Sequence, residues 1–235
     1  MKIKHLHRNI FFALAAAVVV VGASTLSAAT FNGRSELTFD INDEANPNAV
    51  YDQFSDRGLR LGENPAPNYT VEDTSQSLYG YYPVDVDESE AFQIGGVTHW
   101  NGRTVEGTSP DSIVFNVNLD LGAAGNQTFT FDVNYTQGDG TASDVYSIPD
   151  SALSQQTFEI NGTTYALELL GFGQNPGNLN ADFITGTEYT NSKTGVYGQF
   201  VEIPSTVPTP AAAAFGLAGL SLLSLRRNRN KRATQ

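Results

Sequence analysis

The sequence predicts an all-β body, an antiparallel two-sheet β-sandwich of jelly-roll-like form, between an N-terminal signal peptide and a single C-terminal transmembrane helix. Three observations support this prediction. Apolar and polar residues alternate in several segments, Gly, Asn, Asp and Pro interrupt these segments frequently, and no segment of the body sustains a helical period over three turns. The chain divides accordingly into residues 1–29, 30–204 and 205–235, with a closed barrel as the alternative form of the body.

The N-terminus has the three parts of a secretory signal peptide. The basic residues Lys2, Lys4 and Arg8 precede an apolar run at 10–21, and small residues lead up to Ala29. Cleavage is therefore expected directly after Ala29. An uncleaved membrane anchor is the alternative, but the apolar run is short and the small-residue motif favours cleavage.

The strongest strand signal in the body is alternation in two neighbouring segments. Residues 113–121 place Ile113, Phe115 and Val117 on one face, and residues 129–135 repeat the pattern. The intervening residues 122–126 predict a hairpin connection.

A second hairpin is predicted where residues 156–160 lead into Asn161-Gly162 and the chain returns at 163–170. Asn-Gly accepts positive φ at both positions, as a tight two-residue turn requires. Further short strands are expected at 36–41, 68–71, 77–82, 91–94, 144–148, 182–184 and 195–203.

The C-terminal segment begins with prolines, continues as an apolar stretch at 211–225, and ends in basic residues. Fifteen helical residues rise about 22 Å, a short span against roughly 30 Å of hydrocarbon core. The basic cluster is expected to stay cytoplasmic, so the body lies outside. A buried core helix is the alternative. The proline motif is Val207, Pro208, Thr209 and Pro210, and the basic cluster is Arg226, Arg227, Arg229, Lys231 and Arg232.

This succession of Val-Pro-Thr-Pro, an Ala/Gly/Leu helix and an Arg-rich end resembles the PEP-CTERM sorting signal of Gram-negative bacteria, with Thr209 where the family usually has Glu. The resemblance implies that a membrane protease of the exosortase type recognises the proline motif and processes the tail. A eukaryotic GPI signal is the alternative, and four Asn-x-Thr sequons could favour it. GPI tails normally end in their hydrophobic stretch, whereas this chain ends in bases.

Two segments of the body, residues 92–101 with Thr98-His99-Trp100-Asn101 and residues 165–172 with its Gly-Phe end, resemble the choice-of-anchor K domain. That family consists of exported bacterial proteins often paired with PEP-CTERM tails. The resemblance implies an anchored extracellular β domain with no assigned enzymatic activity.

Composition excludes several functions. All 25 acidic residues and only five basic residues lie in the body, which leaves a charge of −20. Such a surface repels phosphate backbones, so we expect no nucleic-acid partner. The chain has no cysteine, which excludes disulfides, a cysteine nucleophile and thiolate metal sites.

His99 is the only histidine that remains after removal of the signal peptide. The chain contains no Gly-x-Ser-x-Gly elbow, and a structural hydrogen bond at a strand end is the ordinary role for a histidine in this setting. If the segment has a binding role, His99, Trp100 and Asn101 would form a ligand-contacting surface where the indole stacks on a sugar ring. No catalytic residue is assigned.

Acidic loops are the remaining candidates. Residues 42–44, 85–90 and 134–150 carry clustered carboxylates, and Asp139 and Asp144 are the weak candidates for a calcium site. No segment has EF-hand spacing, and Asp in loops usually closes turns. We therefore expect no cofactor, with bound Ca²⁺ as the alternative.

These observations favour a non-enzymatic, structural or adhesive protein that is exported and held at the cell envelope or in the exopolysaccharide matrix, its precursor anchored in the inner membrane. The expected partners are the processing enzyme, the membrane and exopolysaccharide. A calcium-assisted carbohydrate-binding module is the first alternative. A carboxylate glycoside hydrolase is the second, because 25 acids can supply a pair at catalytic spacing.

Overall fold

The computed structural model describes residues 29–41, 46–63, 68–72, 82–138, 142–149 and 152–204. These residues form β-strands and one 3₁₀ turn, Gly122–Ala124. No helix within these ranges has the length and apolar character needed to cross a membrane. The predicted signal peptide (apart from Ala29), the proline motif, the C-terminal helix and the basic cluster lie outside the described residues.

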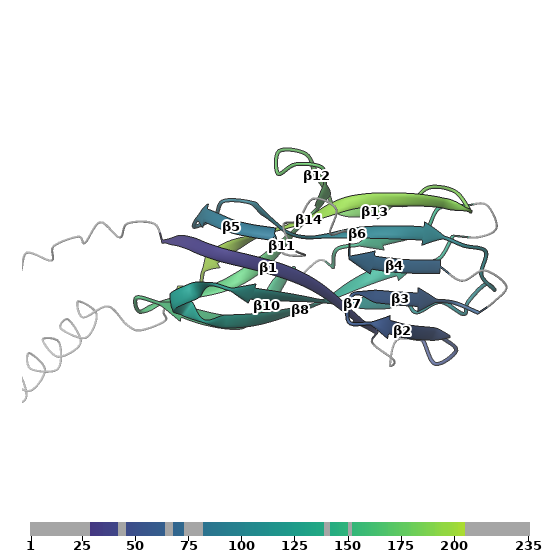
Figure 1. Ribbon diagram of the computed structural model, residues 1–235, viewed down its shortest axis with the longest axis horizontal. Coiled ribbons are helices and arrows are strands. Elements are labelled where there is room, and N and C mark those ends of the chain that lie inside the picture. The colour runs from purple at the N-terminus through teal and green to yellow at the C-terminus, as the bar shows by residue number, and fades with distance from the viewer. Residues whose placement is uncertain are drawn as a thin grey trace, which may run out of the picture.

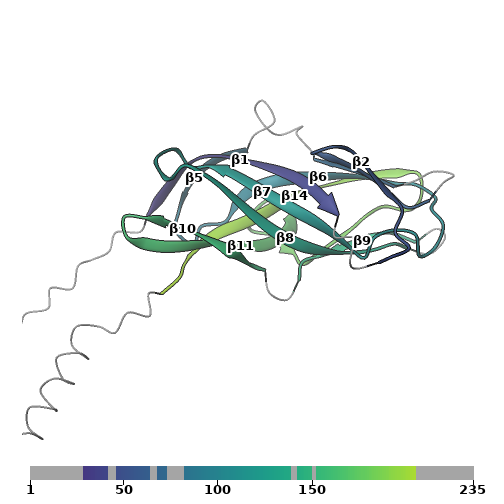
Figure 2. The ribbon, with the colours of Figure 1, turned by 90° about the horizontal axis from the view of Figure 1, so that it is seen from below.

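All strands pair antiparallel in two sheets, and they run along the long axis of the body (Figures 1 and 2). The first sheet has the order β13 (Asp182–Ile184), β9 (Val145–Ser147), β8 (Asn126–Thr136), β7 (Ser112–Asp120), β1 (Thr30–Ile41) and β5 (Tyr82–Asp87). The second has the order β10 (Leu153–Ile160), β11 (Thr163–Gly173), β14 (Thr190–Glu202), β6 (Phe92–Asn101), β4 (Asn68–Glu72), β3 (Gly58–Leu61) and β2 (Tyr51–Ser55). The short β12 (Leu179–Asn180) pairs with the end of β11.

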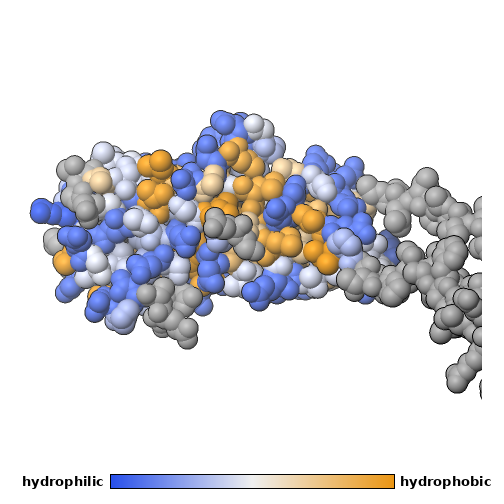
Figure 3. All heavy atoms as spheres, turned by 180° about the vertical axis from the view of Figure 1, so that it is seen from behind, coloured by the Kyte–Doolittle hydropathy of each residue, from blue (hydrophilic) through white to orange (hydrophobic). Residues whose placement is uncertain are grey.

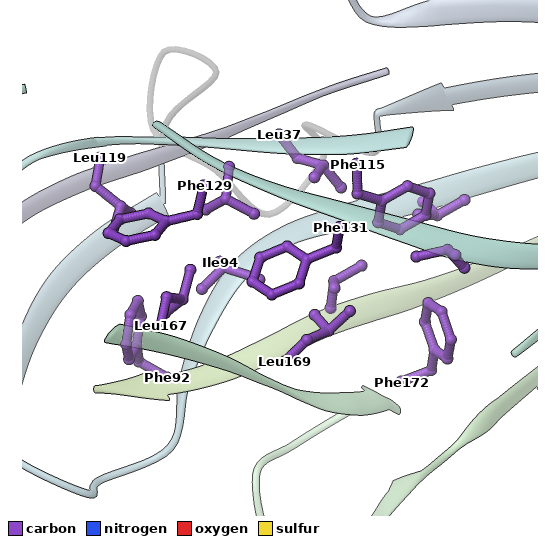
Figure 4. Packing of buried hydrophobic residues seen from close by; sticks show 14 of the residues in the cluster. Leu37, Phe92, Ile94, Phe115, Leu119, Phe129, Phe131, Leu167, Leu169 and Phe172 are labelled. Carbon is purple, nitrogen blue, oxygen red and sulfur yellow. The ribbon is translucent and has the colours of Figure 1, made fainter. Parts of the chain in front are cut away.

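The two sheets face each other across one apolar core (Figure 4). Alternate side chains of each strand point inward, as period-two patterning requires. The rings of Phe31 on β1 and Phe200 on β14 lie 4.1 Å apart, and those of Phe115 on β7 and Phe172 on β11 lie 6.5 Å apart. The predicted all-β class is therefore confirmed, and the sheets are arranged as a sandwich.

Both predicted hairpins are confirmed. β7 and β8 pair along their length through the 3₁₀ turn. Asn161 (φ 52°) and Gly162 (φ 82°) connect β10 to β11 with positive φ at both positions.

The acidic segment 85–90 was predicted as a loop, and this prediction is wrong for its first half. Asp85 and Asp87 belong to β5, where their exposed side chains alternate with the buried Val84 and Val86. Valine and aspartate alternate at residues 84–87, as a strand requires, but so many acidic residues in a short segment are also typical of a loop. Strands β2, β3 and β12 were not predicted, and the strand predicted at 77–82 meets β5 only at Tyr82, its other residues lying outside the described ranges.

β6 continues well past its predicted end at residue 94, through a β-bulge. The register with β14 shifts between Val196 and Tyr197, opposite the region of Ile94 and Gly95. A side chain at Gly95 would place its Cβ 2.5 Å from the Cβ of Leu37, so glycine allows β1 to approach closely. The bulge changes which residues face inward, and His99 on the far side of it enters the core.

The beginning and the end of the described body lie at the same end of the molecule (Figure 2). The N–H of Glu88 donates to the carbonyl of Ala29, and the N–H of the next residue, Ser89, donates to the carbonyl of Phe200. β14 starts at the opposite end, where Thr190 pairs with Asn101. Its 13 residues span about 40 Å at roughly 3.3 Å per residue.

Candidate functional site

A buried polar network joins the two sheets at the end remote from Glu202. Nε2 of His99, on β6 of the second sheet, lies 2.9 Å from Oδ2 of Asp144, and both side chains are almost fully buried, with exposures of 0% and 2%. The Tyr135 hydroxyl, on β8 of the first sheet, donates to the same carboxylate oxygen at 2.9 Å. The Tyr146 hydroxyl, on β9, lies 2.7 Å from Nδ1 of His99.

Asp144 is the centre of this network. Its Oδ1 accepts the backbone N–H of Gly138 at 2.8 Å, and its own N–H donates to the Thr185 hydroxyl at 2.9 Å. A buried carboxylate is costly unless donors surround it, and here three donors do so. With Nε2 protonated, the imidazole donates to the carboxylate, and Nδ1 is left to accept from Tyr146.

The chemistry of this network is structural. Both ring nitrogens of His99 have partners, and the ring does not reach solvent, so the pair cannot meet a substrate in this conformation. Its aromatic members also pack edge-on, with the rings of Tyr135 and Tyr146 5.0 Å apart. The network therefore acts as a clamp between the sheets.

The predicted ligand-contacting surface of His99, Trp100 and Asn101 is wrong for two of its three residues. Inward and outward positions alternate after the bulge, so His99 and Asn101 face the core while Trp100 is half-buried on the outer side. The Asn101 side chain donates to the carbonyl of Gly186 at 2.9 Å and orders the turn before β14. The expected structural hydrogen bond of His99 is present, near the end of its strand.

The two calcium candidates are not alike. Asp139 lies outside the described residues. Asp144 is not an exposed loop residue: it lies one residue before β9, with its carboxylate directed at protein donors inside the body. In the part of the chain that the structure describes, no three His, Asp or Glu side chains are grouped as a metal site.

Ala29, the expected cleavage residue, sits directly before β1, and its carbonyl accepts a hydrogen bond from the β5–β6 turn. The sorting motif Val207, Pro208, Thr209 and Pro210 and the cluster Arg226, Arg227, Arg229, Lys231 and Arg232 lie outside the described residues.

An open cleft of about 640 Å³ lies where the chain passes from the second sheet to the first. We call it the amide cleft. Residues 174–181 project between β11 and β13 as a flap that carries β12 (Figure 1), and the cleft opens at the base of this flap. Viewed from behind, apolar residues gather below the same protrusion (Figure 3).

The lining of the amide cleft combines an aromatic floor with amide side chains. Phe172 and Phe183 form the floor from below, with their rings 6.0 Å apart and exposures of only 2% and 7%, so the large exposed apolar side chain of the lining is Ile184. Three exposed amides, an acid and a base, together with an exposed isoleucine, surround the floor: Gln174, Asn178, Asn180, Asp182, Lys193 and Ile184. One negative and one positive side chain leave the lining without net charge. Among these, the Gln174 amide donates to the carbonyl of Lys193 at 3.3 Å and ties the flap to β14.

No motif in the sequence predicts this cleft. Its signal is the run of residues 174–180, in which four of seven side chains are amides, and such a run is typical of ordinary turns. Residues 174–180 line a cleft only because β12 pairs with β11 and β13 lies nearby.

A second hollow, of about 360 Å³, includes two carboxylates, Glu36 and Asp120, on the first sheet. Both have arginine partners: Arg57 for Glu36, and Arg34 for Asp120 at 3.2 Å. Both carboxylates of this hollow are therefore engaged in ion pairs with arginine.

A comparison of the chain with protein-family models and with curated proteins finds no match. The resemblances to PEP-CTERM and choice-of-anchor K proteins therefore stay predictions from the motifs.

Proposed function

We propose that the protein is an exported, non-enzymatic component of the cell envelope or of the exopolysaccharide matrix of a Gram-negative bacterium, with a structural or adhesive role. In this proposal the signal peptide ends at Ala29, the body is a jelly-roll-like sandwich, and the tail from residue 205 holds the precursor in the inner membrane until an exosortase-type enzyme processes it. The strongly acidic body keeps the protein soluble outside the cell.

The observation that best supports the proposal is the position of the two ends of the body. Because Ala29 and Phe200 are both bound by the Glu88–Ser89 turn, a tail that continues from Glu202 leaves from one end of the sandwich. The whole length of the body then extends away from the membrane. This geometry suits a domain that is presented at a surface.

Two lysines provide a direct test of the topology. After removal of the signal peptide, the chain contains only Lys193, which is exposed on β14, and Lys231, in the basic cluster. An amine reagent that cannot cross the inner membrane should label Lys193 in cells whose outer membrane has been opened, and should label Lys231 only after detergent is added. Labelling of Lys193 only after detergent would contradict the proposal.

Deletion of residues 208–235 tests the tether. The deleted chain should move from the membrane fraction to the medium, whereas deletion of residues 233–235, which spares the basic cluster, should leave fractionation unchanged. Unchanged fractionation of the larger deletion would show that the tail is not the anchor.

A further inference from the structure

The amide cleft has the size and the lining of a ligand site, although the proposed function does not depend on it. Its volume of about 640 Å³ falls within the range of roughly 300–1,000 Å³ that small-molecule sites occupy. Such sites combine an apolar floor with a few directed polar groups, as Phe172, Phe183 and the amides of Gln174, Asn178 and Asn180 do here.

The polar groups of the cleft define the ligand. Each amide offers both a donor and an acceptor, so a ligand that meets several of them must itself alternate donors and acceptors over a short distance. Vicinal hydroxyl groups on a sugar ring do so, and the C–H face of the ring matches the exposed Ile184 side chain. The lining contains one acid and one base, Asp182 and Lys193, so it provides no net charge for an ion.

We infer that the amide cleft binds a neutral hexose polysaccharide, an inference that rests on the proposed function because it names the matrix component to which the exported body attaches. Polyuronates are disfavoured, since a body charge of −20 repels them at low ionic strength.

A third hollow is linked to the amide cleft by one backbone hydrogen bond. This hollow, of about 340 Å³, is lined by β8 and β10 residues and by Pro149, and we call it the Pro149 hollow. The N–H of Ile148, the residue before Pro149, donates to the carbonyl of Ala181 in the wall of the amide cleft at 3.0 Å. The exposed Gln155 lines the Pro149 hollow. In this inference a glycan of several sugars contacts both hollows, and a disaccharide contacts only one.

The test measures binding of the full-length chain, in detergent micelles, to defined oligosaccharides by titration calorimetry. The probes are disaccharides and hexasaccharides of α-linked glucose, β-linked glucose and mannose, with hexagalacturonate as the charged comparison. At least one neutral hexasaccharide should bind more tightly than its disaccharide and at least 10-fold more tightly than hexagalacturonate at low salt. Preference for hexagalacturonate, or no binding of any neutral hexasaccharide, would overturn the inference.

Variants locate the site. Gln174→Ala and Asn180→Ala each remove an exposed amide and should weaken binding about 3- to 10-fold, the value of one or two net hydrogen bonds. Gln155→Ala should weaken binding of the hexasaccharide and leave the disaccharide unaffected. The control is Asn191→Ala, an exposed amide on β14 outside the cleft, which should bind within two-fold of the parent. Equal binding by the parent and the Gln174→Ala, Asn180→Ala double variant would place the site elsewhere.

Failure of this inference can be told apart from failure of the proposed function. If the body is exported and retained in the matrix equally with and without the two amides, the cleft assignment falls and the proposed function stands. If the chain binds neutral hexasaccharides through the cleft but Lys193 is labelled only after detergent is added, the proposed function falls and the cleft assignment stands.

Discussion

Replacement of Asp144 by asparagine is the sharpest test of the clamp between the two sheets. The substitution preserves the shape of the side chain and removes its charge. Asp144 accepts from His99 and Tyr135 at Oδ2 and from the N–H of Gly138 at Oδ1. An asparagine in the same place has one acceptor oxygen and one NH₂ group, so either the N–H of Gly138 faces another donor, or His99 must change tautomer and the Tyr135 hydroxyl must rotate.

The expected loss follows from the burial of the pair. A buried donor without an acceptor costs about 1–3 kcal/mol, and the bonds that persist lose the contribution of the negative charge. Hydrogen bonds to a carboxylate contribute about 1.5–3 kcal/mol each, against about 0.5–1.5 kcal/mol for neutral partners. We therefore expect Asp144→Asn to lower the free energy of unfolding by roughly 2–4 kcal/mol, which for a body of this size corresponds to a fall in Tm of about 4–16 °C.

Urea unfolding monitored by fluorescence measures this loss directly, because the only tryptophan, Trp100, is the neighbour of His99. The control is Asp132→Asn on the exposed face of β8, which should change stability by no more than about 0.5 kcal/mol. A loss below about 1 kcal/mol for Asp144→Asn would refute the reasoning, because the network would then contribute no more than an ordinary surface contact.

Three further predictions concern the core and one turn. Burial raises the pKa of Tyr165 and of Tyr197 above the ordinary value of 10.0, so the folded state holds both phenolic protons more tightly than the unfolded chain. The two tyrosines therefore contribute fully to stability below pH 10, and this contribution is lost as the pH rises above it. Alkaline unfolding should therefore become less steep in the double Tyr→Phe variant, and an unchanged curve would contradict this. Gly95→Ala should cost about 1–3 kcal/mol in urea unfolding, because its Cβ would lie 2.5 Å from that of Leu37; a neutral result would show that the sheets can separate at this point. Gly162→Ala meets no atom within 4 Å and should cost only the strain of positive φ, about 1–2 kcal/mol, and a loss as large as that of Asp144→Asn would exclude this explanation.

The strands that the sequence predicts correctly are those in which local pattern and tertiary environment agree. In β7 and β8 the alternating apolar residues are all buried, since the sandwich covers one face of each strand. Asn161-Gly162 predicts its turn for the same reason: positive φ is a local property that the two side chains accept without help from distant residues.

The candidate site was less predictable, because it depends on contacts between distant segments. The glycines at 95 and 96 are typical of the end of a strand, whereas in the structure they form a bulge that lets β6 continue and turns His99 inward. Asp144 has the sequence environment of a loop, and only its distance from His99, 45 residues earlier in the chain, shows that it is a core residue. The amide cleft is assembled from three strands and a flap, and no short motif specifies it.

The central position of β14 determines how the body would bear a mechanical load. A pull on the chain beyond Glu202 enters a strand that pairs with β11 over residues 195–202 and with β6 over residues 190–198. Hydrogen bonds between antiparallel strands lie across the strand axis, so a force along β14 shears both ladders together and does not peel them apart one bond at a time. A tether attached to an edge strand would load a single ladder. A force that entered the body at Glu202 would thus be shared by both neighbours of β14.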